Sequence, residues 1–418
     1  MTSDGVPAPD VAIIGGGIVG VSLAAILAGR GATVTLYERE GLAAGASGRN
    51  SGVVQRPFDP PLVPLYDETV ALYRELAEVV PDAGVRLPAQ PAGLLLVSRR
   101  EAVVRHVADG LRAAFPALAP DVLDGPALRA VEPSLAPDVV ACRVPIGYPV
   151  VPSAPTFAVA TLAERRGARI RLGHSARPAI DGDRCVGVVV DGRVEPAGST
   201  IVAAGPWTPE VVDPSGRWRP IRPLWGVVVE TGLARPPGHI LEEADMDEAL
   251  GTGEAAEAGA GAGADDPATT PRFSLVTAGG ASVVGSTFLD AEPDPADWQE
   301  RILVRGATFV PGLFDAAIRD LRVCARPLAA DGRPLVGRVP GVDRLFVCAG
   351  HGPWGISTGP GSAQLIAGLV LGEAVDLPPA LDAMRFPGPY DRPAAGAGVR
   401  VPAGASAEPA SSPRTPPG

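Results

Sequence analysis

The stretch Val11-Ala12-Ile13-Ile14-Gly15-Gly16-Gly17-Ile18-Val19-Gly20 decides the fold of this 418-residue chain. Its first four residues predict a short buried strand, and the apolar run from Ile18 to Arg30 predicts a helix. The glycines between them satisfy the pattern GxGxxG that joins strand to helix in dinucleotide-binding units. Gly15 permits a tight turn, Gly17 lets the backbone approach a pyrophosphate, and Gly20 allows close helix packing. The start of the helix would then bind phosphate through free N–H groups and its positive dipole end.

A carboxylate follows the second predicted strand, Thr33 to Tyr37. Glu38 stands about where a carboxylate accepts hydrogen bonds from both hydroxyls of an adenosine ribose, which disfavours the 2'-phosphate of NADP. The alternative is a glycine-rich turn in a protein without a cofactor, with Glu38 at the surface. Strand, turn, helix, strand and acid in this order favour a nucleotide site.

The charge composition excludes several classes of function. The formal net charge is −11 and no basic run occurs, so a surface that binds nucleic acid is not expected. The sequence contains no lysine, so all 36 basic residues are arginine. Schiff-base chemistry with pyridoxal phosphate and a Walker-type ATP site both need a lysine amine and are therefore excluded.

The cysteines and the N-terminal region bear on metal binding and location. Four cysteines lie far apart without a CxxC pair, so neither a metal site nor a disulfide framework is predicted, and a cytoplasmic location is expected. The uncharged stretch from Val11 to Gly29 is interrupted by three glycines, and the residues before it include no arginine. We therefore expect neither export nor a membrane span.

The rest of the chain predicts two kinds of sheet. A helix from Pro64 to Val79, a helix from Pro155 to Arg166, a strand from Arg169 to Leu172, a hairpin through Val186 to Val194 and a strand from Ser199 to Ala203 extend a parallel sheet with crossover helices. Three other segments predict antiparallel strands of a different sheet: Gly93 to Val97, Pro223 to Glu230 and Arg272 to Ser286.

Further motifs extend the pattern beyond the nucleotide turn. The run Ala46-Ser47-Gly48-Arg49-Asn50-Ser51-Gly52-Val53 is followed by Ile201-Val202-Ala203-Ala204-Gly205-Pro206-Trp207, and later by Cys324-Ala325-Arg326-Pro327, Asp331-Gly332-Arg333-Pro334 and Ala349-Gly350-His351-Gly352-Pro353-Trp354-Gly355-Ile356. In order and spacing these blocks resemble the D-amino-acid oxidase superfamily, which includes glycine oxidases, D-amino-acid dehydrogenases, sarcosine oxidases and 2-hydroxyglutarate dehydrogenases. The resemblance covers roughly residues 10 to 386 and implies FAD as the cofactor.

The expected fold class is α/β, with a Rossmann-type FAD-binding domain interleaved with an antiparallel-sheet α+β substrate domain. Residues 10–90, 151–215 and 325–387 would form the FAD-binding domain, and residues 91–150 and 216–324 the substrate domain. Segments 1–9 and 388–418 are expected to be disordered, and 251–270, which has almost no large apolar side chain, to be a flexible insertion.

The resemblance also implies which residues contact FAD. Small residues pack against it, and glycines near the C-terminus let the backbone approach the flavin ring, with a helix from about Gly361 to Leu371 behind it. His351 could act as a base, although a place in the flavin wall is preferred. The expected cofactor-binding residues are Gly15, Gly17, Ile18, Val19, Gly20, Glu38, Arg39, Ser47, Gly48, Arg49, Asn50, Ser51, Gly52, Ala204, Gly205, Trp207, Cys324, Gly350, His351, Gly352, Trp354, Gly355 and Ile356.

Two arginines are candidates for binding a substrate carboxylate, for which a guanidinium fork is well suited. Arg326 stands where the resemblance places that arginine in glycine oxidases and D-amino-acid dehydrogenases; its alternative is a surface role or an ion pair with Asp331. Arg56 stands where sarcosine oxidases have one, or it is a solvated loop charge.

The chain departs from sarcosine oxidases at two positions. Trp354 stands in place of their substrate-binding lysine, and no lysine is present to promote the reaction with oxygen, so both O2 and another carrier remain candidate electron acceptors. Cys324 matches the cysteine that binds their flavin covalently, although many relatives bind FAD without such a bond.

The expected function is transfer of a hydride from the α carbon of a small amino acid or amine to flavin N5, the catalytic residues being Arg326, Arg56 and His351. A second hypothesis is a 2-hydroxy-acid dehydrogenase, which would need a base, often a histidine; the chain has only His106, His174, His239 and His351. A flavin-binding protein without turnover and an NAD dehydrogenase are the two remaining hypotheses.

Overall fold

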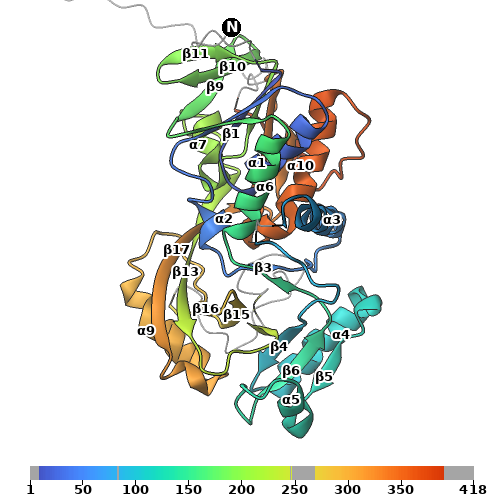
Figure 1. Cartoon of the computed structure of the whole chain (residues 1–418), viewed down its shortest axis with the longest axis vertical. Helices are drawn as coiled ribbons and strands as arrows, with labels where there is room; N and C mark the ends of the chain where they lie inside the picture. Colours follow the sequence, from blue (N-terminus) through green and yellow to red (C-terminus); the bar gives the residue numbers. More distant parts are fainter. Residues whose placement is uncertain (1–8, 82–83, 245, 247–268, 390–418) are drawn as a thin grey trace, which may run out of the picture.

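The computed structural model describes residues 9–81, 84–244, 246 and 269–389. Two main sheets lie at opposite ends of the molecule, and the chain crosses between them several times (Figure 1). The segments expected to be disordered or flexible, 1–9, 251–270 and 388–418, fall outside the described residues apart from their inner ends. Those expectations therefore stay predictions.

The first sheet has six strands in the order β18-β19-β12-β1-β2-β8. β1 (Val11–Ile14) is fully buried at its centre and pairs in parallel with β2 (Val34–Glu38) and β12 (Ser199–Val202), so the predicted parallel sheet is confirmed. Only the edge pair β18–β19 is antiparallel within this sheet. The remaining strands are β8 (Arg169–Leu172), β18 (Leu335–Arg338) and β19 (Leu345–Ala349).

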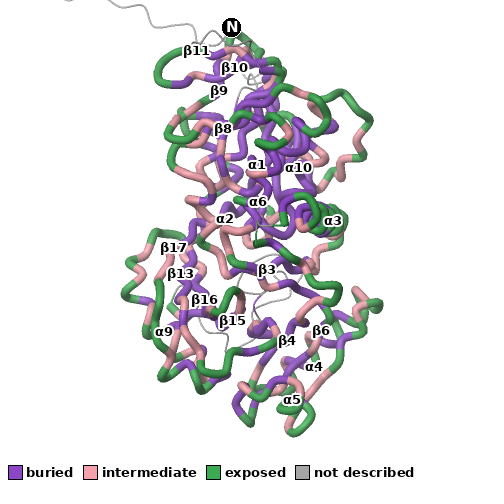
Figure 2. The backbone as a smooth tube through the Cα atoms, in the orientation of Figure 1, coloured by how far each residue is buried: buried purple, intermediate pink, exposed green. Residues whose placement is uncertain are grey.

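Four helices pack together on one face of this sheet: α1 (Ile18–Gly29), α3 (Val63–Val79), α6 (Ala154–Arg165) and α10 (Gly355–Leu371). α1 contacts both α6 and α10, so nearly all of its surface is buried, which explains why it carries no charge. Figure 2 shows buried backbone running through α1 and α10. The three helices predicted from Ile18, Pro64 and Pro155 are confirmed to within one residue at each end.

Helix α10 begins at Gly355, six residues before the predicted start at Gly361, and contains Pro360. A proline inside a helix leaves the carbonyl four residues earlier without its usual donor. Here the hydroxyl of Tyr73, on α3, donates to the carbonyl oxygen of Ile356 at 2.8 Å. Tertiary contact thus permits helical turns that the local sequence argues against.

A small antiparallel sheet covers the other face of the parallel sheet. It consists of β9 (Ala176–Asp181), β10 (Arg184–Val190) and β11 (Arg193–Pro196), and the predicted hairpin is confirmed as β10–β11. Val188 and Val347 belong to the hydrophobic core between the two sheets. The parallel sheet is therefore the middle of three layers.

The second main sheet has eight strands in the order β17-β13-β16-β15-β14-β4-β6-β5. Its pairs are antiparallel as predicted, with one exception: β14 and β4 are parallel, because a long stretch of chain and no hairpin connects them. The strands are β4 (Leu94–Ser98), β5 (Asp121–Leu123), β6 (Val140–Val144), β13 (Ile221–Gly232), β14 (Ile240–Glu243), β15 (Ser274–Ala278), β16 (Ala281–Gly285) and β17 (Ala317–Ala329). The helices beside it are α4 (Glu101–Ala114), α5 (Gly125–Val131) and α9 (Ala296–Ala307).

The two main sheets meet along β17 and at the short pair β3 (Val53–Val54) and β7 (Tyr148–Pro149). β17 runs out of the second sheet toward the first, and Leu328 near its end forms a β-bridge with His351. The expected domain bound between residues 324 and 325 therefore lies inside a strand. We propose the other bounds unchanged as the domain organisation.

Candidate functional site

A cavity of about 550 Å³ lies between the two main sheets. It extends from the glycine turn after β1 to strands β13, β15 and β17, and so combines residues that are far apart in the sequence. Its volume is in the range of small-molecule and cofactor sites.

The glycine turn has the geometry that its sequence predicts. Gly15 has φ +116°, and a Cβ there would lie 2.4 Å from the carbonyl oxygen of Ala203. A Cβ at Gly20 would lie 1.9 Å from the carbonyl oxygen of Gly15, so only glycine lets α1 pack this close to the turn. Gly17 is the N-cap of α1 and lines the cavity together with Ile18 and Val19.

Glu38, at the end of β2, lines the cavity and is fixed by backbone donors. Its Oε2 accepts a hydrogen bond from the N–H of Gly16 at 2.6 Å, and its Oε1 accepts one from the N–H of Glu40 at 2.8 Å. Each oxygen keeps a further lone pair for a ligand hydroxyl. Next to it, the guanidinium of Arg39 lies 4.5 Å from the centre of the Trp207 ring, and both side chains line the cavity.

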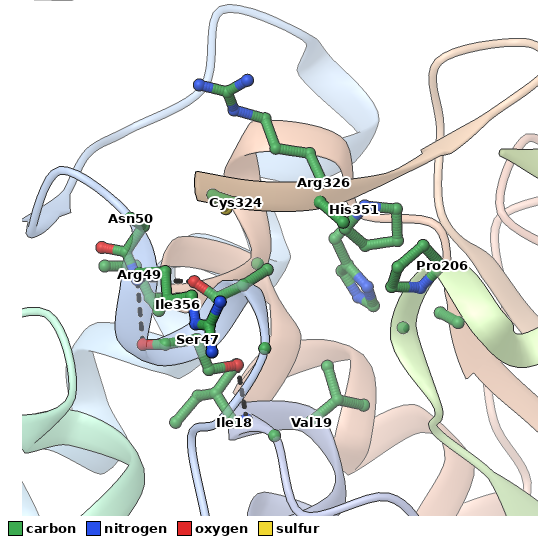
Figure 3. A pocket seen from close by; sticks show the side chains of 18 of the residues that line it. Ile18, Val19, Ser47, Arg49, Asn50, Pro206, Cys324, Arg326, His351 and Ile356 are labelled. Carbon is green, nitrogen blue, oxygen red and sulfur yellow. Dashed lines mark hydrogen bonds between the residues drawn. The ribbon is translucent and has the colours of Figure 1, made fainter. Parts of the chain in front are cut away.

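The run from residue 46 to 53 forms the short helix α2 (Ala46–Arg49) and the bend after it. Ser47 Oγ accepts a hydrogen bond from the N–H of Ile18 at 3.0 Å, and Asn50 Nδ2 donates to the carbonyl of Ser47 at 2.9 Å (Figure 3). The Ser47 hydroxyl thus ties this run to the start of α1, and the Asn50 amide stabilises the run itself. Ser47, Arg49, Asn50, Ser51 and Gly52 line the cavity.

Two further walls combine the backbone of small residues with one tryptophan each. Ala204 and the 3₁₀ turn η4 (Gly205–Trp207) form one, and the turn η7 (Gly352–Trp354) with the first residues of α10 forms the other. A Cβ at Gly205 or Gly355 would meet no atom within 4 Å, so both positions face open space. A flat ligand can therefore approach the backbone at both walls.

His351 lines the cavity and is only 2% exposed. Its Nε2 is 3.0 Å from Ser362 Oγ, inside α10. Burial lowers the pKa of the imidazole to about 4, so the ring is neutral at neutral pH. This environment favours a place in the wall of the cavity over a role as general base.

Cys324 and Arg326 lie two residues apart on β17, and both line the cavity. Burial raises the pKa of the Cys324 thiol, and the nearby charges of Arg326, Arg49 and Arg322 oppose that rise. The thiol is therefore enclosed in a cationic environment without being ionised.

Arg326 has no carboxylate partner among the described residues. Its Nη1 donates to the carbonyl of Thr287 at 3.0 Å and its Nη2 to Ser286 Oγ, while its guanidinium lies 4.9 Å from the ring centre of Phe288. Burial lowers its pKa. Figure 3 shows its side chain extending away from His351.

The alternative role for Arg326, an ion pair with Asp331, is wrong, because Asp331 forms its ion pair with Arg385, 2.6 Å from Nε to Oδ2. The space that the Arg326 guanidinium fills exists because residue 226, across the strand pair, is glycine: a Cβ there would lie 2.3 Å from Nη1. The sequence around Gly226 therefore accommodates a buried cation.

Four expected site residues are not among those lining the cavity. Arg56 lies over the ring of Phe115, 4.9 Å from its centre, so its guanidinium occupies a different environment. Gly20 packs against the glycine turn, and a Cβ at Gly48 would lie 2.3 Å from the carbonyl of Ala43. Gly350 has φ +87°, which gives it a role in turning the backbone. These three glycines shape the site from behind its surface.

The sequence did not indicate several residues that line the cavity. They lie on strands or in the segments that follow strands, and their facing depends on long-range pairing, so no local signal marks them. They include Gln55, Trp225, Glu242, Met246, Ser286 and Phe288.

The residues present fit an FAD molecule. The N-terminus of a twelve-residue helix and the close approach at Gly17 suit phosphates, Glu38 suits a ribose, and the open backbone at Gly205 and Gly355 suits a flat ring. No group of three or more His, Cys, Asp or Glu side chains in the described part of the chain could bind a metal ion. No helix within the described ranges is both long and apolar enough to cross a membrane.

Known proteins are similar to this chain in fold and in sequence. Glycine oxidase from Bacillus cereus ATCC 14579 is 25% identical, with a TM-score of 0.72 over 88% of this chain and 99% of its own. Iminodiacetate oxidase from Chelativorans sp. BNC1 is also 25% identical, with a TM-score of 0.73 over 88% of this chain and 97% of its own. The uncharacterized oxidoreductase YurR of Bacillus subtilis (strain 168) is 28% identical over 223 residues. That match spans 51% of this chain and about half, 53%, of the relative.

The family described as DAO, FAD dependent oxidoreductase, matches residues 10–369, which is most of the chain. The match includes the glycine turn, Glu38, the small-residue walls and Arg326. The expected family, fold class and FAD cofactor are confirmed. This chain belongs to the DAO family of FAD-dependent oxidoreductases.

Proposed function

We propose that the protein oxidises the CH–NH bond of an α-amino acid or related amine, moving a hydride from the α carbon to the flavin. The observation that carries this proposal is Arg326, a cation in the cavity wall with no carboxylate partner among the described residues. A buried charge without a counter-ion is costly, and an anionic substrate supplies the missing partner. The glycine and iminodiacetate oxidases similar to this chain are named for substrates that contain a carboxylate and an amine.

Bound FAD supplies the two-electron acceptor for this reaction. The protein contributes position: Arg326 binds the carboxylate, and its hydrogen bonds to Thr287 and Ser286 fix the plane of the guanidinium. Trp225 and Phe288 line the same part of the cavity and exclude water around the substrate. The imine product would hydrolyse in water after release.

An amine substrate is favoured over a 2-hydroxy acid because neither histidine that lines the cavity is suited to take an alcohol proton. Of the four histidines only His174 and His351 line the cavity. His351 has a pKa of about 4, and its ring contacts Ser362. His174 lies next to Glu38, at the other end of the cavity from Arg326, and its Nδ1 is 3.1 Å from Asp191. An amine needs no such base once it is neutral.

The electron acceptor that regenerates the oxidised enzyme is proposed to be O2 or another carrier. Because the chain has no lysine, an acceptor other than O2 stays a candidate. Comparing the rate of oxygen consumption with the rate of reduction of an artificial dye distinguishes an oxidase from a dehydrogenase. The expected cytoplasmic location and small-molecule substrate belong to the same proposal.

The test of this function is an Arg326→Met variant assayed with pairs of substrates that differ only in the carboxylate, an amino acid and its decarboxylated amine. We expect kcat/KM for the amino acid to fall roughly a hundredfold or more, because a charge-assisted pair is lost. The decarboxylated amine should react equally with both enzymes, within a few-fold. An equal loss for both substrates would contradict a carboxylate-binding role for Arg326.

A further inference from the structure

A carboxylate and an amide lie together in the wall of the cavity, on the side of the second sheet. Glu242, on β14, and Gln55, just after β3, both line the cavity. Gln55 Nε2 donates a hydrogen bond to Glu242 Oε2 at 3.2 Å. Neither residue belongs to the sequence motifs of the nucleotide site.

The amide oxygen of Gln55 is an acceptor without a donor. Gln55 is 3% exposed, and its Oε1 is buried with no hydrogen-bond partner among the described residues. Turning the amide over would place its oxygen against the Glu242 carboxylate, so the orientation is determined. Gln55 is also fixed from behind, because its backbone N–H donates to Ser357 Oγ at 3.0 Å. The cavity wall therefore holds a carboxylate beside an unsatisfied amide oxygen, which a ligand with N–H donors would satisfy.

Strand pairing gives the distance of these acceptors from Arg326. Glu242 pairs with Ser274 on β15, and Ser274 pairs with Gly285 on β16. The Arg326 guanidinium donates to Ser286, the residue after Gly285. Two strand spacings, about 10 Å, therefore separate the Glu242 backbone from that of Gly285, next to the residue that the cation contacts. An extended amino acid with a long side chain can span this gap, and one with a methyl side chain cannot.

The acceptors suit a cation that lies away from the reacting carbon. An amine must give its lone pair to the new C=N bond as the hydride leaves, so it has to be neutral. A carboxylate beside the α-amine would hold it protonated and oppose the reaction. A charged group at the end of a side chain meets no such conflict.

We propose that Glu242 and Gln55 bind the cationic end of the substrate side chain, so that the substrate class is a basic α-amino acid. Its carboxylate binds Arg326, and its ammonium or guanidinium binds between Glu242 Oε and Gln55 Oε1. This rests on the proposed function for the place of the carboxylate and narrows its substrate class.

The first test is binding of two acids that cannot react at an α-amine, measured calorimetrically on the FAD-loaded protein. ε-Aminocaproate has a carboxylate and a distant ammonium, and caproate lacks the ammonium. We expect ε-aminocaproate to bind tighter by roughly tenfold to a hundredfold, and Glu242→Gln to remove that preference. The control Glu300→Gln removes the same charge from an exposed position on α9 and should retain it. Equal binding of the two acids to the wild-type protein, or no binding of ε-aminocaproate, overturns the proposal.

The second test is turnover of lysine against norleucine, which has a similar chain without the charge. The wild-type protein should prefer lysine in kcat/KM, Glu242→Gln should lose most of that preference, and Gln55→Leu should lose part of it. If no amino acid reduces the flavin while ε-aminocaproate still binds preferentially, the proposed reaction fails and the cation site stands. If norleucine and lysine react equally well and the two acids bind equally, the reaction stands and the cation site fails.

Discussion

Two basic side chains in the cavity wall have opposite ionic states. Arg326 stays charged although burial lowers its pKa, because a guanidinium does not lose its proton under ordinary conditions. His351 is neutral, since burial lowers its pKa to about 4. The cavity therefore has a permanent cation, Arg326, for an anionic substrate and a neutral imidazole, His351, in its wall.

The depressed pKa of His351 predicts a dependence of stability on pH. The unfolded chain binds a proton at this histidine near its ordinary pKa of about 6.5, while the folded protein does so only near 4. Between these values the unfolded state binds more protons, so the free energy of unfolding decreases as pH falls and levels off below 4. Between pH 7 and about pH 5, protonation of this histidine in the unfolded chain should lower the free energy of unfolding by about 2 kcal/mol.

Denaturant unfolding of the wild-type protein and a His351→Gln variant at both pH values measures this contribution. The difference between the two proteins should shrink by that amount at the lower pH, since the variant lacks the penalty. A difference that does not change with pH would show that folding does not lower the pKa of His351.

Cys324 predicts how FAD is attached. Its thiol is buried and its pKa is raised despite three nearby arginines, so little thiolate is present to form a bond to the flavin. We expect acid precipitation to release all of the FAD into the supernatant, and a Cys324→Ser variant to behave in the same way. Colour that remains in the pellet of the wild-type protein but not of the variant would contradict this.

Among the elements, β17 and α10 have the largest effect on the site. The pleat of β17 places Cys324 and Arg326 on the same face, and the same strand continues toward His351. The register of β17 against β13 brings Arg326 opposite Leu224 and next to Gly226, which leaves space for the guanidinium. The position of Arg326, which belongs to a local sequence motif, thus depends on the pairing of two strands that are far apart in the sequence.

Helix α10 depends on a hydrogen bond from α3, and this gives a prediction at the level of elements. Replacing Tyr73 by Phe removes the donor to the Ile356 carbonyl and leaves a buried acceptor unsatisfied. The free energy of unfolding should fall by about 1–3 kcal/mol. Affinity for FAD should fall with it, because Ile356 lines the cavity.

The matched control is Tyr66→Phe on the same helix, whose hydroxyl makes no hydrogen bond to the described residues. It should change stability by clearly less. Equal effects of the two substitutions on the unfolding midpoint in urea would show that the Tyr73 bond contributes nothing.

Sequence alone predicted the elements whose signals are local. The turn from Gly15 to Gly20 follows from glycine sterics and an adjoining apolar strand, and the structure has it as expected. The start of α10 was missed because Pro360 argues against a helix and the compensating donor, Tyr73, is remote in the sequence.

At the scale of the whole molecule, the cavity exists only where the two main sheets meet. Glu38 and Gly17 come from the first sheet, and Arg326 and Glu242 from the second. The motifs predicted the first pair and Arg326, because their residue types recur in a fixed local pattern. Glu242 and Gln55 could not be predicted, since their facing results from strand register over long sequence separation. The same holds for Arg56. Its position in the sequence made it a candidate for binding the substrate, but its guanidinium lies over the ring of Phe115 and does not line the cavity.

The most direct test of the account is an anaerobic titration of the purified, FAD-loaded protein, followed through the visible absorption of the oxidised flavin. We predict that α-amino acids bleach this band, that basic ones do so fastest, and that the corresponding 2-hydroxy acids leave it unchanged. A protein that stays colourless after reconstitution with FAD, or a flavin that only hydroxy acids reduce, would contradict the account.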